Sequence, residues 1–302
     1  MATGIYIVSG FLGAGKTTLI QKLLRELFSD EKIVLIENDF GEISVDAALL
    51  RTGSIEVTEM NSGCICCSLT GDFVKAMKEL LERFHPGKII IEPSGVGKLS
   101  DVINACSDPL IKPLASIKKS IAVVDVKRIK MYLDNFGEFF EDQIEMADII
   151  ALSRVEIYPE KISGARMLLR GLNPHAPIIS RPWGEISASG MLFPEQTRSH
   201  DSEHSHEHVH DHSAEEVFDT VTIHVKRTLS LDDMKSGLAK LEQASGEVLR
   251  AKGILPSPSG FMNLQYIPGD ASITKCSAGG DMLCIIGRNL NRRELCALFG
   301  GE

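Results

Sequence analysis

Short apolar runs alternate with amphipathic stretches over the first two thirds of the chain. Between the apolar runs, segments such as 16–28 and 72–84 carry leucine and other apolar residues at helical spacing. The runs, rich in β-branched residues, lie at 5–9, 32–37, 88–92, 120–125, 148–153 and 177–180. Continuously apolar strands separated by helices are typical of a parallel sheet covered on both faces. We therefore expect an α/β fold with a doubly wound, mainly parallel sheet.

This pattern stops near residue 195, and a different texture follows. The segment "HDSEHSHEHVHDHSAEE" from residue 200 is almost free of apolar residues and cannot bury enough surface to order itself. After it, alternating or apolar runs predict strands at 218–225, 260–267 and 281–287, and helical spacing predicts helices at 230–244 and 291–299. We expect three parts: an α/β domain at 1–195, a flexible His-rich linker at 196–215, and a second, smaller α+β domain at 216–302.

Composition narrows the class of protein. The 302 residues are 43% hydrophobic and 24% charged, as in globular proteins, and no apolar run approaches the ~18 residues of a membrane span. The net charge of −9 argues against a nucleic-acid partner. The start of the chain has no basic leader, and seven cysteines, three of them crowded together, favour a reducing compartment. We expect a cytoplasmic protein without membrane or nucleic-acid partners, either a monomer or a homodimer.

The segment "GFLGAGKT" at 10–17 fits G-x-x-x-x-G-K-T, after a predicted strand and at the start of a predicted helix. Its glycines allow backbone N–H groups to surround phosphate oxygens, and the helix start adds partial positive charge. Lys16 would reach the β- and γ-phosphates, and the Thr17 hydroxyl would bind Mg²⁺. A chance glycine-rich turn is the weaker alternative. The expected contacts to a nucleoside triphosphate come from Gly10, Gly13, Ala14, Gly15, Lys16, Thr17 and Thr18.

A P-loop site also needs a carboxylate at the end of another strand. "KIIIEPSG" supplies Glu92 after three isoleucines, and Gly95 would allow the backbone to approach the γ-phosphate. The alternative is a glutamate that is merely solvated at a strand end.

Three cysteines, Cys64, Cys66 and Cys67, lie within four positions after "NSG". Thiolates that converge in a turn favour Zn²⁺, Cu⁺ or other soft ions over Mg²⁺. Three thiolates leave a tetrahedral ion one ligand short, as suits a site that loads and releases metal. The alternative reading is a set of buried, reduced thiols.

These motifs together resemble the CobW-type GTPases, a family of P-loop metallochaperones. The most specific match is the G-C-x-C-C motif at 63–67, and "ENDFGE" at 37–42 and "EPSG" at 92–95 resemble two further family segments. "VVD" at 123–125, "QIEMAD" at 143–148 and "RAKG" at 250–253 also agree. The resemblance extends over essentially the whole chain and implies a P-loop fold with a family-like C-terminal domain.

The resemblance also implies a function. It implies GTP hydrolysis coupled to delivery of Zn²⁺, Co²⁺ or a related ion to a client metalloprotein. We expect slow intrinsic turnover, because the sequence shows no clear arginine placed to reach the phosphates. GTP or GDP, Mg²⁺ and the transition metal are the expected cofactors. The catalytic candidates are Lys16, Asp39 and Glu92, and the implied transition-metal ligands are Cys64, Cys66, Cys67, Glu37 and Glu42.

One segment departs from the family pattern. Where the family reads N-K-x-D or T-K-x-D, this chain has Ser153, Arg154, Val155 and Glu156. Glu156 keeps a carboxylate that can accept hydrogen bonds from guanine, and the stem of Arg154 can lie against a base, but Ser153 loses the amide. We expect these residues to contact the base of GTP, with the choice between guanine and adenine left open.

The histidines of the linker form a second candidate for metal binding. Imidazoles at this density can bind Zn²⁺, Ni²⁺ or Co²⁺ loosely. We expect a metal reservoir or capture arm, and a solvated linker is the alternative. Its members include His204, His206, His208 and His210.

The phosphate loop and the cysteines would act together if they share the segment 37–42. Ordering of this segment by the triphosphate and its release on hydrolysis would then set the metal affinity. The alternative function is a nucleotide-regulated metal store or sensor in which hydrolysis is incidental.

Overall fold

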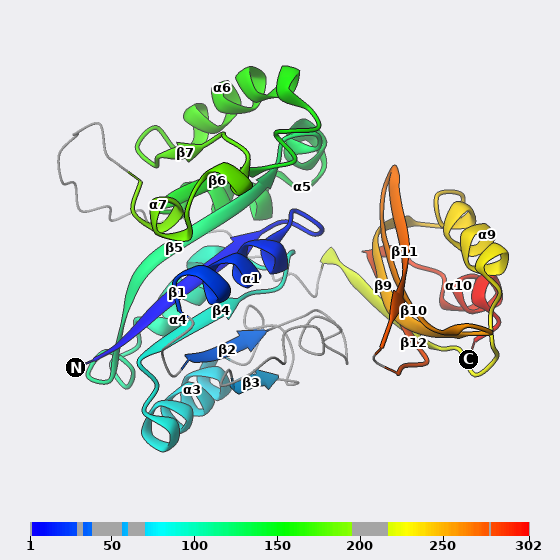
Figure 1. Ribbon diagram of the computed structural model, residues 1–302, viewed down its shortest axis with the longest axis horizontal. Helices are drawn as coiled ribbons and strands as arrows, with labels where there is room; N and C mark the ends of the chain where they lie inside the picture. The colour runs from blue at the N-terminus through cyan, green and yellow to red at the C-terminus, as the bar shows by residue number, and fades with distance from the viewer. Residues whose placement is uncertain are drawn as a thin grey trace. The chain divides into compact units, whose positions relative to one another are not determined.

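The computed structural model describes residues 2–28, 33–37, 56–59, 70–194, 217–277 and 279–301. The chain divides into two compact units, one comprising residues 1–38 and 51–212 and the other residues 39–50 and 213–302. Each unit has its own sheet (Figure 1). Each is described by itself below.

The first unit is built on a seven-stranded sheet in the order β3-β2-β4-β1-β5-β6-β7, and every pairing in it is parallel. Its strands are β1 (Thr3–Gly10), β2 (Ile33–Glu37), β3 (Glu56–Glu59), β4 (Lys88–Glu92), β5 (Ala115–Asp125), β6 (Ile149–Ser153) and β7 (Ile178–Ile179). All residues of β1 and β2 are buried, which explains their largely apolar sequences. The predicted α/β class with a parallel sheet is confirmed.

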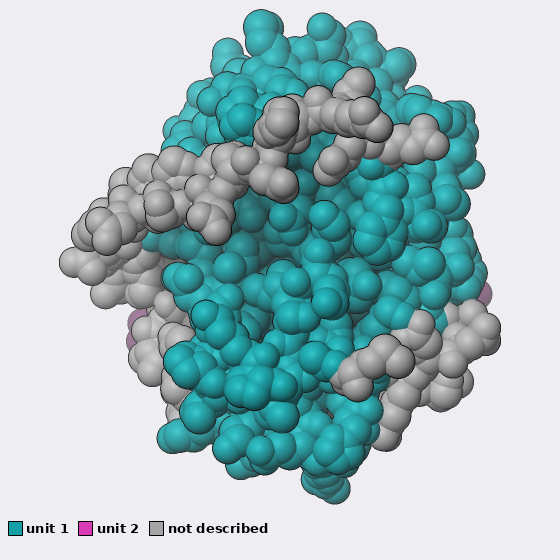
Figure 2. All heavy atoms as spheres, turned by 90° about the vertical axis from the view of Figure 1, so that its left-hand side faces the viewer, with its two compact units in different colours: residues 1–38, 51–212 teal, residues 39–50, 213–302 magenta. Residues whose placement is uncertain are grey.

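Helices lie between most of the consecutive strands, as parallel pairing requires. They are α1 (Lys16–Glu26), α3 (Thr70–Phe84), α4 (Leu99–Cys106), α5 (Ile129–Glu145), α6 (Ile162–Leu172) and α7 (Ala188–Leu192), with short 3₁₀ turns η1 (Pro159–Lys161) and η2 (Trp183–Glu185). In α1 the leucines and isoleucine at 19, 20, 23 and 24 are buried, so the amphipathic pattern faces the core. Figure 2 shows the described side chains of this unit as a closely packed surface.

The order of the strands in this sheet indicates where a ligand would bind. From β1 the chain moves to β2 and β3 on one side, returns through β4 beside β1, and then adds β5, β6 and β7 on the other side. In open parallel sheets, ligands bind at the carboxyl ends of the strands where the strand order reverses. The carboxyl ends of β1, β4 and β5 are therefore the expected position of a site.

The second unit is a five-stranded antiparallel sheet in the order β11-β10-β9-β12-β8. Its elements are β8 (Asp219–His224), α9 (Leu231–Leu241), β9 (Glu247–Ser257), β10 (Gly260–Ile267), β11 (Asp270–Cys276), β12 (Met282–Arg288) and α10 (Arg292–Phe299). Residues of both helices, such as Met234 and Phe299, share one core with the sheet. A capping box between Ser230 and Asp233 fixes the start of α9. The predicted smaller α+β domain is confirmed as a fold class.

The structure differs from the sequence prediction at several elements. Strand β5 begins at Ala115 rather than near 120, and β7 is only two residues long. Strands β3, β9 and β11 were not predicted; β11 is largely exposed and so lacks an apolar run. Among the residues that the structure describes, no helix combines the length and apolar character needed to cross a bilayer. The predicted domain boundaries stay predictions.

Candidate functional site

The loop at 10–15 joins the end of β1 to the start of α1, and its glycines have conformations that other residues rarely adopt. Gly10, Gly13 and Gly15 have φ angles of 141°, 68° and 107°. A Cβ atom on Gly10 would lie 2.3 Å from the carbonyl oxygen of Val123 on the neighbouring strand β5. The loop can follow this path only with glycine at these positions.

The start of α1 is suited to bind an anion. Gly15 is the N-cap residue, no side chain caps the helix, and the first turn has no acidic residue. The first N–H groups of a helix have no partner within the helix, and the helix dipole makes this end partly positive. Phosphate is the anion that glycine-rich loops before a helix usually bind.

Lys16, Thr17 and Glu92 converge at this loop. The Lys16 ammonium is almost fully buried and donates to the Gly10 carbonyl at 3.0 Å. The Thr17 hydroxyl lies 3.5 Å from Glu92 Oε2, and Lys16 Nζ lies 3.9 Å from Glu92 Oε1. A hydroxyl and a carboxylate are hard oxygen donors, which fit Mg²⁺. The structure therefore brings together an ammonium group that can bind phosphate and oxygen atoms that can bind Mg²⁺.

Gly95 and Tyr132 both contact Leu12 of the phosphate loop. A Cβ atom on Gly95 would lie 2.7 Å from Leu12 Cδ2 and 2.9 Å from Leu12 N, so glycine is needed for this close packing. The Tyr132 hydroxyl donates to the Leu12 carbonyl at 3.0 Å. Its ring packs with Phe11, whose ring centroid is 4.5 Å away. The loop is thus held from α5 by a hydrogen bond and by aromatic packing.

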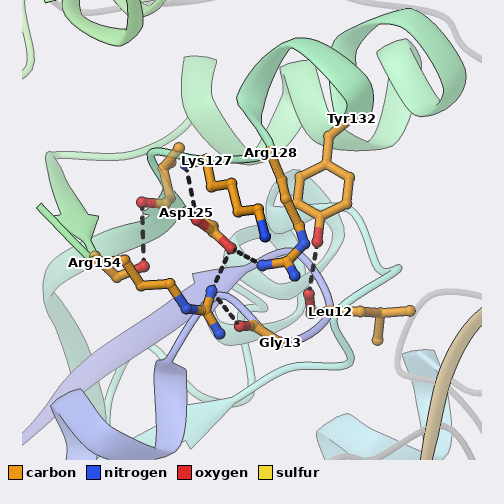
Figure 3. Close-up of polar contacts among 9 residues, drawn as sticks. Leu12, Gly13, Asp125, Lys127, Arg128, Tyr132 and Arg154 are labelled. Carbon is orange, nitrogen blue, oxygen red and sulfur yellow. Dashed lines mark hydrogen bonds and ion pairs between the residues drawn. The ribbon is translucent and has the colours of Figure 1, made fainter. Parts of the chain in front are cut away.

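A buried charge cluster ties the loop to strands β5 and β6 (Figure 3). The Asp125 carboxylate, at the end of β5, is fully buried and accepts from the guanidinium groups of Arg128 and Arg154. Arg154 also donates to the carbonyl of Gly13 at 3.3 Å. Arg154 has a positive φ of 57°, a conformation that is uncommon outside glycine and indicates that its surroundings hold it in position.

The other residues predicted to contact the nucleotide differ in their exposure and in their distance from the loop. The Ser153 hydroxyl donates to the Val124 carbonyl at 3.4 Å, and the Ser153 Cβ lies 3.7 Å from the point a Gly15 Cβ would occupy. Ser153 therefore adjoins the phosphate loop. Glu156 is exposed. Ala14 is buried, and Thr18 is exposed in the first turn of α1.

Of the predicted transition-metal ligands, the structure describes Glu37, which is buried at the end of β2. Within the described ranges, His, Cys, Asp and Glu side chains form no group of three or more that could hold a metal ion. The catalytic candidate Asp39 and the remaining metal-binding candidates lie outside the described residues; the latter are Glu42, Cys64, Cys66, Cys67, His204, His206, His208 and His210.

Sequence reasoning missed three residues that the structure brings to the loop. Arg128 is the N-cap residue of α5, Tyr132 lies in the first turns of that helix, and Trp183 lies in the turn after β7. The strand-end position of Asp125 was the one available signal, because a carboxylate there must meet cations when it is buried.

Comparison with known proteins agrees with this geometry. Residues 4–180 match the family described as "CobW/HypB/UreG, nucleotide-binding domain". The zinc chaperone CobW of Sinorhizobium sp is 29% identical over 299 residues, covering 85% of this chain and 82% of that protein. The zinc-regulated GTPase metalloprotein activator 1 of Saccharomyces cerevisiae is 28% identical over 216 residues, covering 62% of this chain and 50% of that protein.

Among solved structures, the chain is similar to the Zn(II)-bound YjiA GTPase from E. coli, with a TM-score of 0.49 and 19% identity over 99% of this chain and 98% of that chain. The family match covers more than half of the chain and includes the phosphate loop, Glu92, Asp125 and Arg154. The chain belongs to the CobW/HypB/UreG family of nucleotide-binding proteins, as its motifs predicted.

Proposed function

We propose that this chain binds and slowly hydrolyses GTP with Mg²⁺, and that it couples hydrolysis to binding a transition metal, Zn²⁺ or Co²⁺, and delivering it to a client metalloprotein. Relatives named as a zinc chaperone and as a GTPase metalloprotein activator support this class of function. The proposed setting is the cytoplasm, where cysteine ligands stay reduced.

Nucleotide binding follows from the loop and its surroundings. Backbone N–H groups at 13–18 would receive the phosphate oxygens, and the Lys16 ammonium would neutralise charge between the β- and γ-phosphates. The Thr17 hydroxyl and the Glu92 carboxylate would hold Mg²⁺, which when bound stabilises the charge on the phosphates. Water attacks the γ-phosphorus, the bond to the β–γ bridging oxygen breaks, and GDP and inorganic phosphate leave.

Turnover is expected to be slow without a partner. An arginine that reaches the γ-phosphate accelerates such reactions by about 10³-fold or more. Arg154, which donates to the Gly13 carbonyl of the loop, and Arg128 are both bound to Asp125. Arg154 holds the loop in position, and a client or metal could supply the missing acceleration.

The observation that carries the coupling is a pairing of two glutamates. Glu37, a proposed metal ligand, and Glu92, beside Thr17, are direct partners in the pairing of β2 with β4. Paired residues on neighbouring strands lie about 5 Å apart. A metal at Glu37 and a nucleotide at Glu92 would therefore act on the same sheet edge, and each would change the charge that the other meets.

The test is the effect of metal on hydrolysis. GTP turnover is measured by phosphate release, with and without Zn²⁺, in the wild type and in a Cys66→Ser, Cys67→Ser variant. The proposal expects Zn²⁺ to change the wild-type rate at least threefold and the variant rate by much less. Unchanged turnover in the wild type would favour a metal store or sensor with incidental hydrolysis, and absence of turnover would overturn the enzymatic part.

A further inference from the structure

The base end of the nucleotide site has an unusual set of side chains. In the pairing of β5 with β6, Asp125 is the direct partner of Ser153. The Ser153 hydroxyl is directed to the carbonyl of Val124, and Arg154 is held by Asp125 and by the Gly13 carbonyl. Glu156, with an exposed carboxylate, is the acceptor of this segment. A donor on the opposite side of the base has to come from another element.

Trp183 is the candidate for this donor. It begins the turn η2 (Trp183–Glu185) after β7, and its six-membered ring adjoins the phosphate loop. The ring atoms Cη2 and Cζ3 lie 3.6 and 3.9 Å from the point a Gly15 Cβ would occupy, and the Ser153 Cβ lies 3.7 Å from the same point. The loops after β1 and β7 and the end of β6 thus meet at Gly15.

The indole N–H of Trp183 is an unexplained polar group. Its Nε1 atom is buried and has no hydrogen-bond acceptor among the residues that the structure describes. An indole nitrogen can only donate, and a buried donor without an acceptor destabilises the structure. A ligand oxygen at this place would remove that cost.

We propose that Trp183 forms part of the base subsite and that its ring N–H selects a purine with a carbonyl oxygen at ring position 6. This inference rests on the proposed nucleotide-binding function. Guanine has an acceptor oxygen at position 6, whereas adenine has an amino donor there. The indole N–H can donate to the guanine oxygen but finds no acceptor in the adenine amino group, and such mismatches discriminate strongly.

Glu156 completes the selection. A carboxylate accepts from the ring N–H and the exocyclic amine of guanine, and adenine lacks both donors at those positions. One donor from the loop after β7 and one acceptor from the loop after β6 together match guanine. This pair compensates for the Ser153 hydroxyl, which replaces an amide at the equivalent position in the family pattern.

The experiment uses the fact that Trp183 is the chain's single tryptophan. Dissociation constants for GDP, IDP and ADP are measured by calorimetry for the wild type, Trp183→Phe and Phe193→Ala. Phe removes the N–H and keeps an aromatic ring, and the exposed Phe193 serves as the control. Tryptophan fluorescence of the wild type is recorded during each titration.

We expect GDP and IDP, which share the carbonyl, to lose about tenfold in affinity in Trp183→Phe, while ADP binding changes less than twofold. Tenfold corresponds to about 1.4 kcal/mol. Wild-type fluorescence should change on binding GDP, and Phe193→Ala should behave as the wild type.

Three results would overturn the inference. The GDP to ADP ratio could be the same in the wild type and Trp183→Phe, all three nucleotides could weaken equally, or the wild type could prefer ADP. In each case GDP or ADP binding with Mg²⁺ would still support the phosphate site. Failure of the wild type to bind any of the three would overturn the proposed function together with the inference.

Discussion

The Thr17 hydroxyl lies 3.5 Å from a carboxylate oxygen of Glu92, although 75 positions separate the two residues in the sequence. Thr17 lies in the first turn of α1, after the first strand, and Glu92 ends β4, which pairs with β1. The parallel pairing brings a helix start and a strand end to the same edge of the sheet. This contact joins the phosphate loop to the carboxylate that the proposed Mg²⁺ site requires.

Glu92→Gln tests this contact. The amide keeps the shape of the side chain but loses the charge that attracts Mg²⁺. We expect the Mg²⁺ concentration needed for half-maximal GTP binding to rise about tenfold, and GDP binding without Mg²⁺ to stay within about threefold. Glu82→Gln, on the exposed side of α3, is the control. Equal Mg²⁺ dependence in wild type and Glu92→Gln would exclude Glu92 from the site.

Asp125→Asn should destabilise the first unit. The variant removes the buried ion pair between Asp125 and Arg128, and breaking a buried ion pair on one side costs about 3–5 kcal/mol. Urea unfolding followed by circular dichroism measures the loss. Asp134→Asn, on the exposed side of α5, should lie within about 0.5 kcal/mol of the wild type. A similar value for Asp125→Asn would show that the cluster contributes little.

Tyr132→Phe should affect the loop more than the core. The variant loses the hydrogen bond to the Leu12 carbonyl, worth about 1 kcal/mol, and keeps the packing on Phe11. We expect GDP affinity to fall by about threefold to tenfold with a small change in stability. Tyr132→Leu, which also removes the ring, should lose stability as well. Unchanged GDP affinity in Tyr132→Phe would mean that the loop does not depend on this bond.

Much of the fold could be predicted because its pattern is local. Strands such as β1 and β4 have a buried, largely apolar centre, so sequence alone identifies them. Strand β3 has only four residues, and β11 is exposed, so neither leaves an apolar signal. Their pairing partners stabilise them, and partners are not visible in a local pattern.

The candidate site likewise has residues that the sequence predicts and contacts that it does not. Lys16 and Thr17 belong to a contiguous motif, and Glu92 follows from the rule that strand ends meet at one edge. The contact between Arg154 and Asp125 depends on the pairing of β5 with β6, in which Asp125 is opposite Ser153. Such contacts require the register of two strands, which the sequence pattern does not specify.

Asp101 gives the protein a pH dependence outside the site. Burial, with repulsion from Asp142 as a smaller cause, raises the pKa of Asp101 to about 6, although Lys98 opposes this. Since the folded-state pKa lies above the unfolded value of about 3.9, the unfolded chain releases the proton first as the pH rises. This group therefore lowers stability progressively between about pH 4 and pH 6, and the loss is complete above that window.

Asp101→Asn should remove this loss. We expect the variant to match the wild type near pH 4 and to exceed it at pH 7 by on the order of 1 kcal/mol, a value reduced for the partial exposure of the group. Urea unfolding at the two pH values measures the difference. A variant that is less stable than the wild type at pH 7 would contradict the assigned pKa shift.

The central claim is that nucleotide state sets metal affinity. Its most direct test is a competition titration of Zn²⁺ and Co²⁺, run once with GDP and once with Mg²⁺ and a non-hydrolysable GTP analogue, on the wild type and on Cys66→Ser, Cys67→Ser. We predict that the wild-type affinity differs between the two states by tenfold or more, about 1.4 kcal/mol of coupling, and that the double variant loses the difference. The same metal affinity in both nucleotide states would contradict the account, because linkage would then leave the phosphate loop and the metal site independent.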